Sequence, residues 1–182
     1  MNKLIYTITI VIIPLLFVSQ EVLLYDNFES YSNGYDVISN TGLQAWGDNG
    51  TGATVIDNGN GASSSDSYYQ SPTGSSTFQY VITPVTGYTY AMYADINVSN
   101  WIHSAIKIQI VSLNGSGNND DVTVADVSFN NYGGSNSINS WKEVTASYTT
   151  DGTEGGNLAF RIKKTWGGVG EKIDDWRVVC TS

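Results

Sequence analysis

Two stretches of strict alternation between apolar and polar residues, 88–98 and 102–111, constrain the fold of this chain most. Successive side chains of a strand point to opposite sides of the sheet, so each stretch predicts a strand with one buried and one solvated face. Such half-buried strands are typical of antiparallel sheets. The apolar faces are Tyr88, Tyr90, Met92, Ala94, Ile96 and Val98 in the first stretch, and Ile102, Ile106, Ile108 and Ile110 in the second.

The polar faces of these two strands indicate a surface suited to a sugar. A sugar ring stacks on an aromatic face, and its hydroxyls need polar partners. If the strands pair through a connection at 99–101, one surface is lined by Tyr93, Asp95, His103, Lys107 and Gln109, with Trp101 at its rim. Lys107 and Gln109 singly fit an ordinary solvated sheet face better, whereas for Trp101 with His103 the two interpretations are equally favoured.

Residues 1–19 have the pattern of a secretory signal peptide, because Lys3 is followed by an apolar run over 4–18 and then by Ser19. The run is too short to predict a membrane span. Cleavage after Ser19 leaves residues 20–182 with seven basic and seventeen acidic side chains, a net charge of −10. The sequence therefore predicts a secreted, acidic protein without membrane insertion. Nucleic acid is disfavoured as a partner because phosphate binding needs a basic patch.

Residues 20–182 predict a single domain of the all-β class. Gly, Ser, Thr and Asn are abundant, and no helical periodicity, internal repeat or linker is present. Short strands at regular spacing predict a two-sheet antiparallel β-sandwich, or jelly roll. Cys180 is the sole cysteine, so no internal disulfide is possible, and we expect it to pack at the end of the last strand. Further strands are predicted at 22–25, 53–56, 67–70, 77–82, 122–129, 141–148, 157–163 and 172–179.

The sequence holds no convincing catalytic constellation. His103 is the only histidine, and no Gly-x-Ser-x-Gly motif is present. A glycosidase needs two carboxylates facing each other across a cleft, and the candidate glutamates are scattered. The scattered glutamates are Glu29, Glu143, Glu154 and Glu171. We therefore predict a protein that is not an enzyme.

Two pairs of acidic residues suggest a metal site. Asp26 and Glu29 lie at the start of the domain, and Asp174 and Asp175 lie near its end. Hard oxygen ligands of this kind suit calcium, and a site between neighbouring first and last strands would tie the termini together. On spacing alone, plain surface carboxylates fit these four residues better. The polar run 114–121 is interpreted as an exposed hairpin end rather than as a cation site.

Four motifs in sequence resemble carbohydrate-binding modules of the galactose-binding-like jelly-roll kind. Their order and spacing agree from about residue 23 to residue 179. The resemblance implies non-catalytic binding of a polysaccharide and a structural calcium, with Glu29 and Asp174 as ligands and Asp26 and Asp175 as further candidates. The motifs are Asn27-Phe28-Glu29, Thr86-Gly87-Tyr88-Thr89-Tyr90, Trp141-Lys142-Glu143-Val144 and Lys172-Ile173-Asp174-Asp175-Trp176.

The resemblance also implies that aromatic rings hold the ligand, in one of two places. On the concave sheet face the candidates are Trp101, His103 and Tyr93. In the loops at one edge they are Trp46, Tyr68 or Tyr69, and Trp166, the last within a glycine-rich segment where a large ring has little local core to enter.

Two other functions remain open at this stage. One is a structural or adhesive extracellular surface protein that self-associates, and the other is a small jelly-roll glycoside hydrolase or lyase. The net charge does not decide whether a glycan partner is neutral or anionic, because basic side chains could form a local patch. These are Lys107, Arg161, Lys163, Lys164 and Lys172.

Overall fold

The computed structural model describes residues 19–30, 44–45, 54–57, 59–62, 67–70, 76–97, 105–113, 121–130, 140–166 and 172–182. Within these residues the chain forms strands and turns and contains no helix long and apolar enough to cross a membrane. The strands are β1 (Gln20–Asp26), β2 (Gln44–Ala45), β3 (Thr54–Asp57), β4 (Ser67–Gln70), β5 (Ser76–Ile82), β6 (Thr89–Asn97), β7 (Ala105–Ser112), β8 (Val122–Asn130), β9 (Lys142–Thr149), β10 (Leu158–Trp166) and β11 (Lys172–Thr181).

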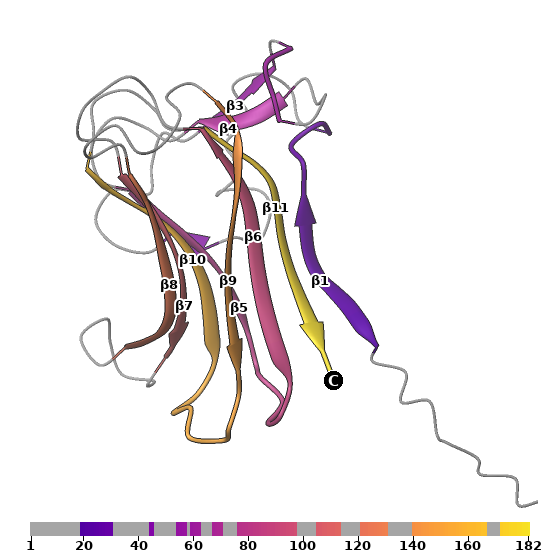
Figure 1. The fold of residues 1–182 in the computed structure, drawn as a ribbon, viewed down its shortest axis with the longest axis vertical. Helices are drawn as coiled ribbons and strands as arrows, with labels where there is room; N and C mark the ends of the chain where they lie inside the picture. Colours follow the sequence, from indigo (N-terminus) through magenta and orange to yellow (C-terminus); the bar gives the residue numbers. More distant parts are fainter. Residues whose placement is uncertain are drawn as a thin grey trace, which may run out of the picture.

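The strands form two antiparallel sheets that face each other, which confirms the predicted all-β sandwich (Figure 1). The six-stranded sheet has the order β3-β4-β11-β6-β9, with β1 paired to β11 beside β4. The five-stranded sheet has the order β2-β5-β10-β7-β8. The first and last strands, β1 and β11, are neighbours, which is the arrangement that the resemblance to carbohydrate-binding modules implies.

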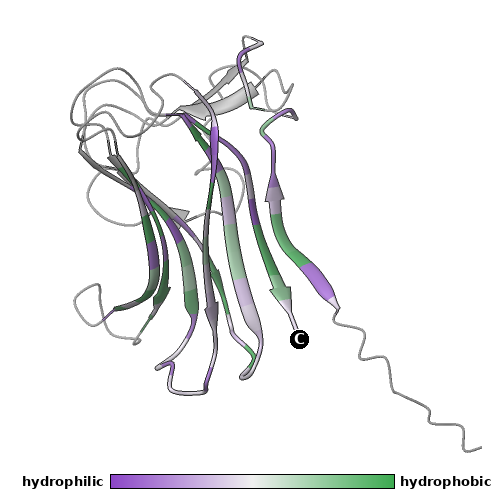
Figure 2. Ribbon diagram, in the orientation of Figure 1, coloured by the Kyte–Doolittle hydropathy of each residue, from purple (hydrophilic) through white to green (hydrophobic). Residues whose placement is uncertain are grey.

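The core lies between the two sheets and is built mainly from apolar side chains of β6, β9 and β11 on one side and of β7 and β10 on the other. Figure 2 shows hydrophobic residues along strands of both sheets. Alternation places Met92 and Ile96 of β6, Ile108 of β7 and Phe160 of β10 in one buried cluster. In β11 an irregularity between Asp174 and Arg177 shifts the alternation by one residue. Ile173 and Trp176, three positions apart, consequently both reach the core.

The predicted alternation of buried and solvated faces is confirmed for the two long strands, β6 and β7. The prediction that these two strands pair with each other is wrong. β6 pairs with β11 and β9 in one sheet, whereas β7 pairs with β10 and β8 in the other. The two strands meet through their apolar faces across the core, so their polar faces look outward on opposite sides of the sandwich. Tyr93 and Asp95 therefore cannot share a surface with Lys107 and Gln109.

Candidate functional site

Polar residues occupy one register row across all strands of the five-stranded sheet. Gln79 of β5 and Gln109 of β7 both lie opposite Arg161 of β10, because β10 is paired on both sides. The neighbours of Arg161 along β10, Phe160 and Ile162, point into the core, so this row belongs to the outer face. The complete row, from β2 to β8, is Gln44, Gln79, Arg161, Gln109 and Asp126.

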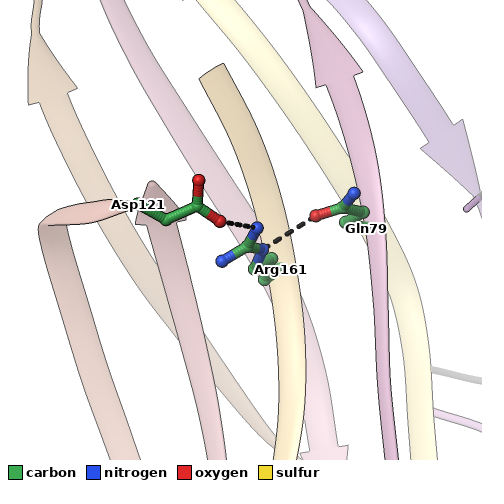
Figure 3. A network of polar contacts seen from close by, with 3 residues as sticks. All are labelled: Gln79, Asp121 and Arg161. Carbon is green, nitrogen blue, oxygen red and sulfur yellow. Dashed lines mark hydrogen bonds and ion pairs between the residues drawn. The ribbon is translucent and has the colours of Figure 1, made fainter. Parts of the chain in front are cut away.

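Arg161 is held in the middle of this row by two charged or polar partners (Figure 3). Its Nη2 donates to Oδ2 of Asp121 at 2.7 Å, and its Nε donates to Oε1 of Gln79 at 2.7 Å. The side chains of Arg161 and Asp121 are only 3% and 8% exposed. A buried charge of this kind is tolerated because it is paired and hydrogen-bonded, so the network fixes the position of the guanidinium and of the Gln79 amide.

The exposed part of the outer face lies beside this network on β7 and β8. The side chains of Lys107 and Asp126 are 38% and 43% exposed, and their Nζ and Oδ2 atoms are 3.6 Å apart. Gln109 and Lys163 are half-buried on the same face. Ammonium, amide and carboxylate groups together can donate to and accept from hydroxyls, so this area has the hydrogen-bonding chemistry that a polysaccharide requires.

The aromatic residues expected to bind the ligand are not gathered here by the described part of the structure. Trp101, His103 and Trp46 lie outside the described residues. The backbone of Trp166 pairs with Ala105 at the end of β10, on the five-stranded sheet. The backbone of Tyr69 pairs with Ile173 on the six-stranded sheet. The structure thus places Trp166 on the sheet that carries the polar row.

Tyr93 lies on the opposite outer face, in a cluster of charged residues and tyrosines. The guanidinium carbon of Arg177 lies 4.5 Å from the centre of the Tyr93 ring, and Arg177 Nη2 lies 2.6 Å from Oε2 of Glu143. Nearby, the Tyr25 hydroxyl donates to Oδ1 of Asp175 at 3.0 Å. Because Arg177 already stacks on one side of the Tyr93 ring, that side is not open to a sugar.

Carboxylates crowd together around Arg177 on this face. Burial, followed by the negative charges of Asp175 and Glu143, raises the pKa of Asp95, and the smaller effect of Arg177 opposes this. Burial and then the hydrogen bond to Asp175 raise the pKa of the Tyr25 hydroxyl. The excess of negative charge makes this surface unfavourable for an acidic ligand.

The four expected calcium ligands lie along the seam between β1 and β11. Asp174 is fully buried, and its Oδ2 and Oδ1 accept the backbone N–H groups of Ala62 at 2.7 Å and of Asp175 at 2.8 Å. Asp26 Oδ1 accepts the N–H of Phe28 at 2.8 Å, and Glu29 is exposed. Among the residues that the structure describes, no three His, Cys, Asp or Glu side chains lie together as a metal site would require.

The sequence did not predict the buried network that Arg161 forms with Asp121 and Gln79. The alternation of β10 did place Arg161 away from the core, but it gave no sign that another segment would bury it. Asp121 ends the polar run that was interpreted as an exposed hairpin end, and this is wrong for Asp121 itself, whose side chain is 8% exposed and paired with Arg161. The two residues are 40 positions apart, so no local pattern in the sequence indicates the pair.

No protein-family model matches the sequence, and no curated protein sequence matches it either. Solved structures do match. The xylan-binding CBM22-1 domain of Xyn10C from Paenibacillus barcinonensis superposes with a TM-score of 0.58 at 14% identity, over 88% of this chain and 94% of that domain. A family 16 carbohydrate-binding module superposes with a TM-score of 0.53 at 12% identity, over 69% of this chain and 84% of the module.

The chain has the fold of carbohydrate-binding modules. A cyclase from Fischerella sp. TAU shares this fold, with a TM-score of 0.62 at 14% identity over 89% of this chain and 98% of the cyclase. Identities this low establish the fold alone, and the same sandwich carries binding modules and enzymes. The function of this chain must therefore be argued from its own side chains.

Proposed function

We propose that this protein is a secreted, non-catalytic carbohydrate-binding protein that recognises a polysaccharide on the outer face of the five-stranded sheet. The register row from Gln44 to Asp126 is the observation that supports this proposal. Gln79 and Arg161 of this row are buried, so a ligand would contact its other end, where Gln109 of β7 and Asp126 of β8 reach the surface with Lys107 beside them. Donors and acceptors on two neighbouring strands suit the hydroxyl groups of a polysaccharide.

Each side chain of the face has a different part in this binding. Lys107, Gln109 and Asp126 are accessible and would make hydrogen bonds to sugar hydroxyls. Arg161 and Gln79 are too deeply buried to contact a chain on the surface, so they act as positioning residues that keep the row rigid. Trp166, at the end of the same sheet, is the aromatic residue that we propose for stacking, with Trp101 and His103 as further candidates.

A hydrolytic function is not favoured by the carboxylates of this face. Glycoside hydrolysis needs two carboxyl groups on opposite sides of the scissile bond. Among the described residues of this face, Asp126 interacts with Lys107, and Asp121 is buried against Arg161. The arrangement supports binding without catalysis.

The proposal includes a structural calcium near the seam of β1 and β11, on the ground of the resemblance to carbohydrate-binding modules, with Glu29 and Asp174 as ligands and Asp26 and Asp175 as further candidates. The described carboxylates do not gather in a group of three, and both Asp174 oxygens already accept backbone N–H groups, so backbone carbonyls would have to complete the shell. Thermal unfolding in calcium and in chelator tests this part. The midpoint should be higher in calcium and the difference should shrink in Glu29→Gln, whereas equal midpoints for the unaltered protein would remove calcium from the proposal.

Binding to a panel of soluble and insoluble polysaccharides is the test of the main proposal. Gln109→Ala and Trp166→Ala should each weaken retention on the polysaccharide that binds best. Thr145→Ala is the matched control, because Thr145 is an exposed sheet residue on the opposite outer face. If no polysaccharide binds, or if Thr145→Ala weakens binding as much as Gln109→Ala does, the outer face of the five-stranded sheet is not the site.

Self-association is a second candidate function, and β1 is the feature that favours it. In the described residues β1 pairs only with β11, so much of its other edge is an open strand edge. Val22 and Tyr25 on this strand are 60% and 55% exposed. An exposed apolar edge strand can pair with another copy. Size-exclusion chromatography over a concentration series without sugar would reveal such assembly, and Val22→Lys should abolish it.

A further inference from the structure

A pocket is lined by residues of β1, of β11 and of the segment that connects β5 to β6. In Figure 1, the start of β1, the end of β11 and the connection between β5 and β6 lie at the same end of the sandwich. The volume of the pocket is about 160 Å³. It is formed between residues of β1, β11 and the 82–90 segment, and not by the polar row of the five-stranded sheet. The lining residues are Glu21, Leu23, Ile82, Thr83, Val85, Tyr88, Tyr90 and Cys180.

The walls of the pocket are mainly apolar. Leu23, Ile82 and Tyr88 are half-buried and pack against the core. The Tyr90 hydroxyl accepts the backbone N–H of Val85 at 2.8 Å, so this polar atom already has a partner within the wall. Aliphatic side chains and tyrosine rings around a space of this size favour a flat or compact apolar group over a hydroxyl-rich one.

One carboxylate lies at the exposed side of the pocket. Oε2 of Glu21 lies 3.8 Å from Sγ of Cys180, and Glu21 itself is exposed. Burial, with the added negative charge of Glu21, raises the pKa of the Cys180 thiol, so the thiol remains neutral at neutral pH. Glu21 is therefore the single charged side chain in the lining.

We propose that this pocket binds a small amphiphilic amine, with one ring or a short alkyl chain between the apolar walls and an ammonium group beside Glu21. The volume supports one ring, because an engineered apolar cavity of about 150 Å³ in another protein binds benzene. A sugar of similar size is disfavoured because its hydroxyls would meet the side chains of Leu23, Ile82 and Val85. This site is independent of the polysaccharide-binding proposal, since it lies at the end of the sandwich and not on its outer face.

Cys180 provides a specific measurement, because it is the only cysteine of the chain and lines the pocket. The rate at which iodoacetamide alkylates it is measured with increasing benzylamine, benzyl alcohol or benzoate, which share a ring and differ in charge. Benzylamine should slow alkylation at about fivefold lower concentration than benzyl alcohol, and benzoate should be the weakest. Xylose should have no effect, and alkylation of free glutathione serves as the reagent control.

Glu21→Gln separates the two parts of the proposal. Glu21 is exposed on the first strand, so the variant should fold, which thermal unfolding checks. In this variant the preference for benzylamine over benzyl alcohol should disappear while protection by the ring remains. An unchanged preference in Glu21→Gln would overturn the role of the carboxylate. Failure of all three ring compounds to slow alkylation at millimolar concentration would overturn the pocket as a binding site.

Discussion

Replacing Arg161 with methionine tests whether the buried network of the five-stranded sheet holds this face together. Methionine keeps most of the volume but removes the donors to Asp121 Oδ2 and to Gln79 Oε1, both at 2.7 Å. The Asp121 side chain, 8% exposed, would then be a buried carboxylate without the guanidinium. Removing one partner of a buried ion pair costs about 3–5 kcal/mol. Arg161→Met should therefore lower the free energy of unfolding by about that amount.

Urea unfolding of a double-mutant cycle separates the pair from the general effect of the substitution. Asp121→Asn removes the charge from the partner, so the double variant should be less destabilised than the sum of the two single variants, by about 1–3 kcal/mol. The matched control is the cycle of Lys107→Met and Asp126→Asn on the same face. These side chains are 38% and 43% exposed and 3.6 Å apart, so solvent screening limits their coupling to less than about 1 kcal/mol.

The Arg161–Asp121 cycle and the Lys107–Asp126 cycle together test whether the buried Arg161 network stabilises the five-stranded sheet. If Arg161→Met is no more destabilising than Lys107→Met, the Arg161 network does not support the sheet, and its proposed positioning role fails with it. The slope of unfolding free energy against urea should be the same for all variants, because otherwise the unfolded state has changed and the free energies cannot be compared.

Three further predictions concern the turns and the opposite face. Gly156→Ala should destabilise the fold by about 1–3 kcal/mol in urea unfolding, because its Cβ would lie 2.5 Å from the backbone oxygen of Leu113. Because the folded state raises the pKa of Asp95, ionised Asp95 costs stability at neutral pH and the cost disappears as pH falls through that pKa. Asp95→Asn should therefore raise the unfolding midpoint at pH 7, and the gain should vanish in acid; a lower midpoint at pH 7 would contradict this. The hydrogen bond from the Tyr148 hydroxyl to Glu154 raises the pKa of Tyr148 to about 12, and ultraviolet titration should show it falling toward its ordinary value in Glu154→Gln.

The sequence predicted the faces of the strands well, because burial leaves a local signal. The alternation of Met92 with Tyr93, or of Ile108 with Gln109, follows from the two-residue period of a strand that has one side in the core. Each predicted strand has a counterpart in the structure, β2 alone among the described strands was not predicted, and Cys180 packs at the end of the last strand. The pairing of first and last strands was also expected, from the resemblance to sandwich modules, and is confirmed.

Strand partners and buried polar pairs could not be predicted in the same way, since neither leaves a local signal. The connection over 99–101 was interpreted as a hairpin, although β6 and β7 belong to different sheets. Alternation specifies which side of a strand is buried but not which strand lies beside it. Similarly, Arg161 and Asp121 are 40 positions apart, and only the folded sheet shows that they form a pair.

The placement of Arg161 links the stability of this face to its proposed use. A long-chain charged residue on the outer side of a sheet normally extends into water, where it loses little on folding. Here it is 3% exposed and held from two sides, which carries a desolvation cost that an ordinary solvated face would avoid. Under the proposed function, a rigid sheet gives a reason to retain that cost: the network ties Gln79 of β5 and Asp121, which directly precedes β8, to β10, so the strands that carry the polar row are held together before a ligand arrives. The same network gives no such benefit to a sandwich that serves only as a spacer, so it favours a binding function for this face.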